Sequence, residues 1–212
     1  MFIELIDLLR CTKPHEDTWL VASFQTVLNR FVGEGTLGCP VCKAEYPIAH
    51  GEADFTGGTT APSCEEQRAQ ANRDREQLAT RAGAFLDVTE PGATVVLGGV
   101  WAHAAQELSQ MSRSRILTLN PSSDIRESET VGLLRVASDI PVAPNSVLGV
   151  ALDSWFPVSI VDSALRAVRP GGRIVGPAEI QPPEALAVLA HDERYWVGQK
   201  SPAVVQLSKS RR

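Results

Sequence analysis

From residue 92 onward, short apolar segments alternate with segments of helical periodicity, and this alternation restricts the fold more than any other feature of the sequence. Strands that alternate with helices form a parallel sheet, because each helix carries the chain back across a sheet face in a right-handed crossover. We therefore expect an α/β fold with helices on both faces of the sheet. The expected strands are 93–97, 115–119, 132–137, 146–152 and 173–176, the expected helices are 100–111, 158–168 and 183–190, and an antiparallel pair, 194–198 with 203–207, should end the sheet.

The first 56 residues differ from the rest of the chain. They contain three of the four cysteines and several glycines, a composition typical of a small β-rich module. A turn-rich stretch follows, and then a charged segment from Glu65 to Arg81 that predicts a water-exposed helix with Ser63 as its N-cap. We therefore expect a small module at 1–56, a linker and connecting helix at 57–86, and the α/β domain at 87–212.

Cys11, His15, Cys39 and Cys42 form the pattern C-x3-H-x23-C-x2-C. Zinc prefers four nitrogen or sulfur ligands in a tetrahedron, and two short loops that supply two ligands each satisfy this preference. A module of this size buries little core, so a metal ion would supply the missing stability. We predict a structural zinc ion held by these four residues, with no open position for catalysis.

Other interpretations of the cysteines stay open in the sequence. Cys11 follows an apolar segment and would also fit as a buried core cysteine. The C-x2-C pair is compatible with a redox pair, although the residues after it indicate a turn and a strand instead of the helix that follows a thioredoxin-type pair. His50 and Cys64 are alternatives to His15 as the fourth ligand, and Cys64 also suits the start of a helix.

The run Ile3–Cys11, followed by Gly35–Gly51, carries the string Cys-x2-Cys-x3-Tyr-Pro-Ile-x2-Gly. It resembles the short zinc ribbons of the Trm-type family of tRNA-methyltransferase activators, over about a quarter of the 212 residues. The family usually has two cysteines in the first loop, where this chain has Cys11 and His15. In that family the ribbon is no enzyme but covers an apolar face of a methyltransferase, so the resemblance implies structural zinc and a protein partner.

A second resemblance concerns residues 80–208. The segment Ser163–Val175 predicts a helix that ends at Pro-Gly-Gly and continues as a strand. The segment Asp139–Leu152 carries an acidic residue before an Ile-Pro step. Both are similar to class I S-adenosylmethionine-dependent methyltransferases, which have a Rossmann-like sheet. The resemblance implies S-adenosylmethionine as a cofactor, bound by Gly98, Gly99, Asn120 and Asp139.

The expected cofactor loop departs from that family. A glycine-rich turn normally follows the first strand, and a carboxylate at the end of the second strand holds the ribose. Here the bulky Trp101 follows Gly98 and Gly99, and the second strand ends in Asn120. A neutral amide lacks the charge-assisted hydrogen bond, which is about twice as strong. The segment 121–130 has no apolar helical period, so a crossover helix should be shortened or lost.

Two interpretations of the α/β domain follow. Either the four residues bind S-adenosylmethionine and methyl transfer proceeds by positioning and desolvation, or the fold is a scaffold with a degraded pocket in which Trp101 is a plug or core residue. Trp155 and Phe156, after the fourth expected strand, would stack on a planar substrate or cover the sheet. No catalytic residue can be named. We expect a methyltransferase-like protein with a zinc ribbon and a degenerate, non-catalytic cofactor site; the alternatives are an active methyltransferase and a zinc-ribbon module that serves as a subunit or activator of a larger assembly.

Composition limits the function classes further. A hydrophobic content of 43% excludes a disordered chain. No segment reaches the about 18 to 20 apolar residues of a membrane span, and the N-terminus lacks the basic region of a signal peptide. We expect a cytoplasmic protein without membrane contact. The net charge of −5 opposes broad capture of nucleic acid, so any contact with RNA or a ribonucleoprotein would need a local patch.

Overall fold

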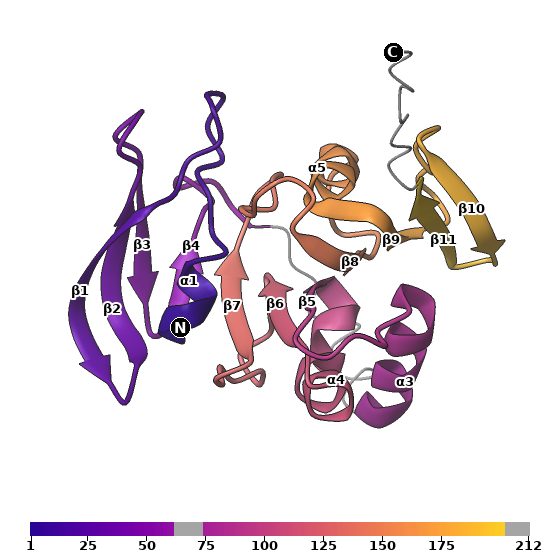
Figure 1. Cartoon of the computed structure of the whole chain (residues 1–212), viewed down its shortest axis with the longest axis horizontal. Coiled ribbons are helices and arrows are strands. Elements are labelled where there is room, and N and C mark those ends of the chain that lie inside the picture. Colours follow the sequence, from indigo (N-terminus) through magenta and orange to yellow (C-terminus); the bar gives the residue numbers. More distant parts are fainter. Residues whose placement is uncertain (62–73, 202–212) are drawn as a thin grey trace, which may run out of the picture.

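In the computed structural model of the chain, residues 1–61 and 74–201 are described. Their strands form one eleven-stranded sheet in the order β1-β2-β3-β4-β7-β6-β5-β8-β9-β11-β10 (Figure 1). The strands are β1 (Val21–Leu28), β2 (Phe31–Gly38), β3 (Glu45–Ala49), β4 (Glu52–Asp54), β5 (Thr94–Gly98), β6 (Arg115–Leu119), β7 (Val131–Arg135), β8 (Val147–Ala151), β9 (Val168–Pro177), β10 (Leu186–His191) and β11 (Tyr195–Lys200). The N-cap expected at Ser63, Cys64 and the strand expected at 203–207 lie outside the described residues.

The centre of the sheet is parallel and buried. Strands β7, β6, β5, β8 and β9 pair in parallel, and β11 pairs antiparallel with β9. All residues of β5 and β8 are buried, which explains why these strands are continuous apolar runs. The predicted fold class, an α/β sheet of Rossmann-like type preceded by a small β-rich module, is confirmed.

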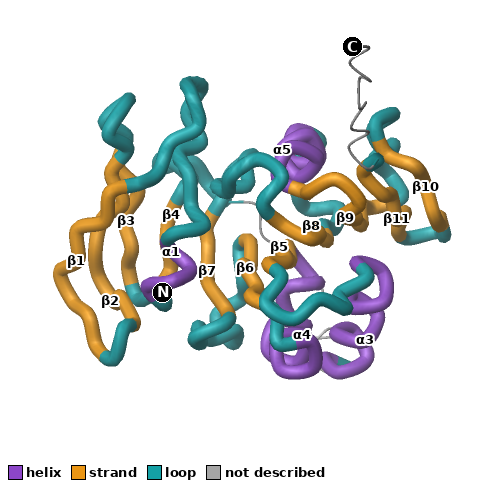
Figure 2. The backbone as a smooth tube through the Cα atoms, viewed as in Figure 1, coloured by secondary structure: helices purple, strands orange, loops and turns teal. Residues whose placement is uncertain are grey.

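Helices cover both faces of this sheet (Figure 2). On one face, α3 (Arg75–Leu86), the 3-10 helix η1 (Gly99–Ala104) and α4 (Ala105–Ser112) share a hydrophobic core with β5 and β6. On the other face, α5 (Ser159–Ala167) and the short α1 (Ile3–Ile6) belong to a second core. Residues 120–130, between β6 and β7, contain no helix, as their polar sequence predicts.

The N-terminal strands extend the same sheet. Strands β1 to β4 pair antiparallel in chain order, and β4 pairs in parallel with β7, from Glu52 opposite Leu133 to Asp54 opposite Arg135. Leu5 of α1 packs so closely over β7 that a Cβ at Gly132 would lie 3.1 Å from its side chain. The sheet therefore crosses the boundary expected at residue 56, and the division into domains stays a prediction.

The C-terminal part differs from the expectation in one element. The prediction of a helix at 183–190 is wrong, because Leu186–His191 forms strand β10, which pairs antiparallel with β11. The apolar residues of this segment suit either period, and the unpaired edge of β11 decides for a strand by supplying hydrogen bonds to its backbone. Among the described residues, β11 thus lies between β9 and β10, and the partner expected at 203–207 lies outside them.

Strand β9 begins earlier than expected. It starts at Val168 and contains Pro170-Gly171-Gly172, which bulges out because the pairing with β8 jumps from Val147–Val168 to Gly149–Arg173. Gly171 has a φ of 81°, and a Cβ at Gly172 would collide with the carbonyl oxygen of Leu148. The glycines therefore permit this bulge within β9, whereas the sequence predicted that Pro-Gly-Gly would precede the strand.

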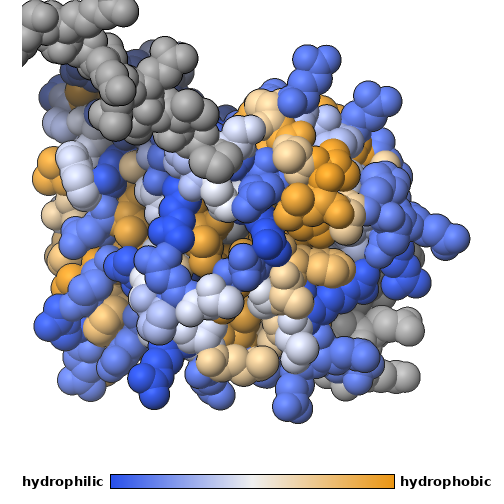
Figure 3. Space-filling view, turned by 45° about the vertical axis from the view of Figure 1, so that its right-hand side comes forward, coloured by the Kyte–Doolittle hydropathy of each residue, from blue (hydrophilic) through white to orange (hydrophobic). Residues whose placement is uncertain are grey.

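The surface is mixed in character. The face in Figure 3 is mostly hydrophilic, with smaller hydrophobic patches between the polar side chains. No helix in the described part of the chain has both the length and the apolar character that a membrane span requires.

Candidate metal centre and cofactor turn

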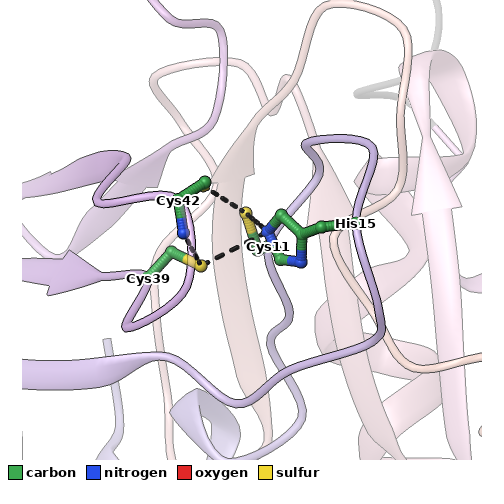
Figure 4. Close-up of side chains that lie close together, drawn as sticks. All are labelled: Cys11, His15, Cys39 and Cys42. Carbon is green, nitrogen blue, oxygen red and sulfur yellow. Dashed lines mark hydrogen bonds between the residues drawn. The ribbon is translucent and has the colours of Figure 1, made fainter.

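Two loops of the N-terminal module bring the four predicted ligands together. Cys39 and Cys42 lie in the turn between β2 and β3, and Cys11 and His15 lie in the loop between α1 and β1. Their side chains point toward one another (Figure 4). One potential ligand atom from each residue lies within 4.8 Å of all the others.

The spacing of these atoms fits a tetrahedral zinc ion. The Nε2 atom of His15 lies 3.1 Å from the Sγ of Cys11 and 3.3 Å from the Sγ of Cys39. The sulfurs of Cys11 and Cys42 are 3.6 Å apart, far beyond the about 2 Å of a disulfide. Zinc–sulfur bonds of about 2.3 Å in a tetrahedron place two sulfurs about 3.8 Å apart. The donor set, three sulfurs and one imidazole, is also one that zinc prefers.

Neighbouring groups orient the imidazole and one thiolate. Nδ1 of His15 lies 2.6 Å from the carbonyl oxygen of Glu16, and this hydrogen bond is the main cause that raises the pKa of His15. With its proton on Nδ1, the ring turns the Nε2 lone pair toward the sulfurs, as in zinc sites. The hydroxyl of Tyr46, a residue buried against Phe55, lies 3.1 Å from the Sγ of Cys11.

The turn between β2 and β3 favours a thiolate at Cys39. Burial raises the pKa of this thiol, but hydrogen bonds from the backbone N–H groups of Cys42 and Val41, together with those to the Cys42 and Cys11 side chains, lower the pKa to about 7. Burial raises the pKa of Cys11. Because a metal binds the thiolate, the backbone of the turn prepares Cys39 for ligation.

The loop that carries Cys11 is attached to the α/β part of the chain. Leu9 forms a β-bridge with Val142, and the N–H of Arg10 donates to the carbonyl oxygen of Pro141 at 2.9 Å. The guanidinium of Arg10 lies 3.4 Å from the ring centre of Trp19, in a cation–π contact. The Cys/His cluster is therefore connected through the main chain of Leu9 and Arg10 to the loop that follows β7.

The glycine turn after β5 is filled by side chains of this chain. Gly98 ends β5, and a Cβ at this position would lie 2.7 Å from the ring of Phe156. Gly99 follows with a φ of 63°, and a Cβ there would overlap the carboxylate of Asp153. Phe156 is 4% exposed and Asp153 is 3% exposed. The positions that side chains at Gly98 and Gly99 would take are therefore occupied by Phe156 and Asp153.

Asp153 also accepts hydrogen bonds from backbone N–H groups at the turn. Its Oδ2 accepts from the N–H of Val100 at 2.6 Å, and its Oδ1 accepts from the N–H of Trp155 at 3.1 Å. Burial raises the pKa of Asp153 to about 6 despite these bonds. Asp153 directly follows the strand expected at 146–152, and this position was the signal for it in the sequence.

The other two predicted cofactor residues serve the loops at this end of the sheet. The side chain of Asn120 donates to the carbonyl oxygen of Val136 at 3.0 Å and accepts from its N–H at 2.8 Å. It thus clamps the chain after β7 to the end of β6. Asp139 is exposed and accepts from the hydroxyl of Ser138 at 3.0 Å. The assignment of these residues to a cofactor stays a prediction.

Trp101 belongs to the core beneath α3. It is fully buried, and its ring centre lies 6.1 Å from that of Phe85 and 5.0 Å from that of Tyr195. The core role is one of the two that the sequence left open for this residue. Of the pair after β8, Phe156 covers the glycine turn, and Trp155 is half-buried.

Comparison with known proteins gave similarities of structure alone. No model of a protein family matches the sequence, and no curated protein matches it. A putative sarcosine dimethylglycine methyltransferase from Galdieria sulphuraria is 18% identical, with a TM-score of 0.40 over 55% of this chain and 52% of that chain, so this chain spans about half of its length. A putative S-adenosyl-L-methionine-dependent methyltransferase from Methanococcus maripaludis is 9% identical, with a TM-score of 0.49. The match covers 71% of this chain and 100% of that chain. A complex between the Trm112 methyltransferase activator and a putative methyltransferase from Haloferax volcanii is 16% identical, with a TM-score of 0.46. The match covers 66% of this chain and 97% of that chain.

The pKa of Asp153 predicts a pH dependence of stability. Since the folded state raises this pKa from 3.8 to about 6, the carboxyl group contributes stability that is complete below pH 3.8 and is lost as the pH rises through about 6. Asp153→Asn cannot ionise. The unfolding free energy of the wild type relative to this variant should therefore fall by on the order of 3 kcal/mol between about pH 4 and pH 7. Urea unfolding at a series of pH values measures the difference, and parallel curves would contradict the assignment.

Proposed function

We propose that this protein is a zinc-stabilised scaffold with a methyltransferase-like fold, which neither binds S-adenosylmethionine nor transfers methyl groups. One observation carries the proposal: Phe156 and Asp153 occupy the space over Gly98 and Gly99. Rossmann-like cofactor sites need that space, because the ligand approaches the backbone of the glycine turn directly. The residues present therefore do not fit the cofactor.

The state of the neighbouring loops supports the same conclusion. Both polar atoms of the Asn120 side chain are hydrogen-bonded to the backbone of Val136, which directs the side chain toward the loop after β7. The loop after Asp139 is held to α5, since the N–H of Ile140 donates to the hydroxyl of Ser163 at 2.9 Å and the guanidinium of Arg166 donates to the carbonyl oxygens of Ile140 and Val142 at 2.8 Å. A cofactor would have to displace several buried groups at once.

Zinc in this proposal has a structural role. Cys11, His15, Cys39 and Cys42 would hold it, and four protein ligands leave no position for a substrate. The ion would fix the loop whose Leu9 and Arg10 pair with the α/β part of the chain. The ribbon and β4 would then provide within one chain the support that a separate activator gives a methyltransferase.

A scaffold of this kind acts through binding, and we propose a protein as its partner. The order β7-β6-β5-β8-β9-β11-β10 favours a second candidate, an active S-adenosylmethionine-dependent methyltransferase, because this is the strand order of that enzyme class. The second candidate would require residues 153–156 to leave the glycine turn.

Calorimetric titration of the zinc-loaded protein with S-adenosylmethionine separates the two candidates. We expect no binding heat up to about 1 mM ligand, which corresponds to a binding free energy weaker than about −4 kcal/mol. Binding in the micromolar range, weakened by Asp139→Ala and unaffected by Asp162→Ala, would establish the enzyme. Asp162 is the matched control because it is an exposed carboxylate on α5.

A further inference from the structure

The two ends of the sheet carry apolar edge strands, β1 and β10 (Figure 1). In the described part of the chain, β1 pairs with β2 alone and offers its other edge to solvent. Seven of its eight residues are exposed, among them Val21 at 64%, Val27 at 47% and Leu28 at 75%. An edge of this length and character is a template for pairing with another strand.

The usual protection of such an edge is weak in β1. Natural edge strands carry charges, especially lysine, that prevent association. Residues 18–29 contain no charged side chain. Two shifts of register, between Phe24 and Thr26 and between Thr26 and Val27, interrupt the pairing with β2 near the middle of the strand.

A second copy of this chain suits the edge for reasons of symmetry. A two-fold axis between Phe24 and Gln25 would pair residues 21–24 of each copy with residues 25–28 of the other. Such an interface closes the assembly at two subunits. Because the strand is uncharged, self-pairing sets no like charges opposite each other. The same register brings Trp19, which is 62% exposed, opposite Arg30 of the other copy.

The charged residues that flank β1 favour the antiparallel direction. Glu16 and Asp17 precede the strand, and Arg30, which also pairs with Glu4, follows it. Antiparallel pairing places the acidic end of one copy beside Arg30 of the other, whereas parallel pairing sets acidic residues against each other.

The surface beside β1 has room for side chains of the second copy. A hollow of about 770 Å³ is lined by residues 25–29 together with Phe31, Gly33 and Glu127. The two-fold register sets residues 20–24 of the other copy, including Leu20 and Val21, beside this half of the strand. We propose that the protein forms a two-fold dimer through antiparallel pairing of β1 with β1 of a second copy. This inference does not depend on whether the protein binds S-adenosylmethionine.

Sedimentation of the full-length, zinc-loaded protein over a range of concentrations tests the dimer. We expect a dimer that Val27→Lys weakens at least tenfold in dissociation constant, because the lysine would be buried against an apolar neighbour. Val188→Lys is the matched control, since Val188 lies on the opposite edge strand β10 and is 49% exposed. It should leave the dimer unchanged. Circular dichroism and zinc content verify that both variants fold.

A charge exchange tests the direction of pairing. Asp17→Lys and Arg30→Glu should each weaken the dimer several-fold, and the double variant should recover most of the loss. A wild-type protein that stays monomeric at about 100 μM, a Val27→Lys variant that dimerises normally, or a dimer lost on Val188→Lys would overturn the proposal. Failure of the double variant to recover would overturn the antiparallel register.

Discussion

His15→Ala is expected to lower the zinc affinity of the protein at least about a hundredfold, whereas His50→Ala is expected to leave it unchanged. Nε2 of His15 lies among the sulfurs of the cluster, and its other nitrogen is held by the carbonyl oxygen of Glu16. The His50 side chain is 96% exposed and pairs with Glu34 at 3.5 Å. Competition with a chromophoric chelator measures both affinities, and His50 tests the alternative ligand that the sequence left open.

Removal of the metal should strongly lower the stability of the N-terminal module. Binding of structural zinc contributes about 10 to 16 kcal/mol in small zinc modules, where it is coupled to folding. Cys39→Ser, or dialysis against a strong chelator, should therefore unfold residues 1–56 and loosen the contact of Leu9 with Val142. Hydrogen exchange followed by mass spectrometry would locate the loss of protection.

The control for Cys39→Ser is Cys64→Ser, which replaces the other cysteine that the sequence offered as a ligand. We expect this variant to keep one equivalent of zinc and the wild-type exchange pattern. Cys39→Ser with a full zinc equivalent, or loss of zinc on Cys64→Ser or His50→Ala, would contradict the ligand set.

Gly99→Ala is expected to destabilise the protein more than Gly92→Ala does. Both glycines have a positive φ, 63° at Gly99 and 78° at Gly92, which costs a residue with a Cβ about 1 to 2 kcal/mol. No atom lies within 4 Å of a Cβ at Gly92, whereas a Cβ at Gly99 meets the Asp153 carboxylate. The overlap should add about 1 to 3 kcal/mol at Gly99. Urea unfolding of the two variants gives the difference.

The pair of Gly99 and Asp153 can be tested by a double-mutant cycle. In an Asp153→Ala background the overlap is absent, so Gly99→Ala should then cost no more than Gly92→Ala does. Equal effects of Gly99→Ala in both backgrounds would mean that Asp153 does not fill the turn. That result would also remove the main support for the non-catalytic scaffold.

The metal cluster is the part of the site for which the sequence was most informative. Zinc ligands come in short chelating loops, so the spacing of Cys39 and Cys42, and of Cys11 and His15, predicts which side chains gather. The structure brings these four together. The sequence alone left His50 and Cys64 open, because a ligand contributed from a distant loop has no spacing rule.

The glycine turn was the part for which the sequence was least informative. The sequence indicated Gly98, Gly99 and Asn120 because motifs consist of residues close together in the chain. The residues that contact them in the fold are distant in the chain, so no motif indicates them. Phe156 and Asp153 reach the turn from the end of β8, which lies beside β5 in the sheet. A contact between strands more than fifty residues apart depends on strand order, and no local pattern encodes that order.

The sequence by itself determined the type of most elements from residue 92 onward, because the period of buried side chains is 2 in strands and 3.6 in helices. It also predicted that Cys11, His15, Cys39 and Cys42 lie together, since chelation depends on spacing within loops, and the structure places them so. Only the tertiary structure decided that β4 pairs with β7, that 186–191 is a strand, and that side chains of the protein fill its own glycine turn. These outcomes depend on backbone hydrogen bonds and on space left by distant neighbours, which exist only once the chain is folded.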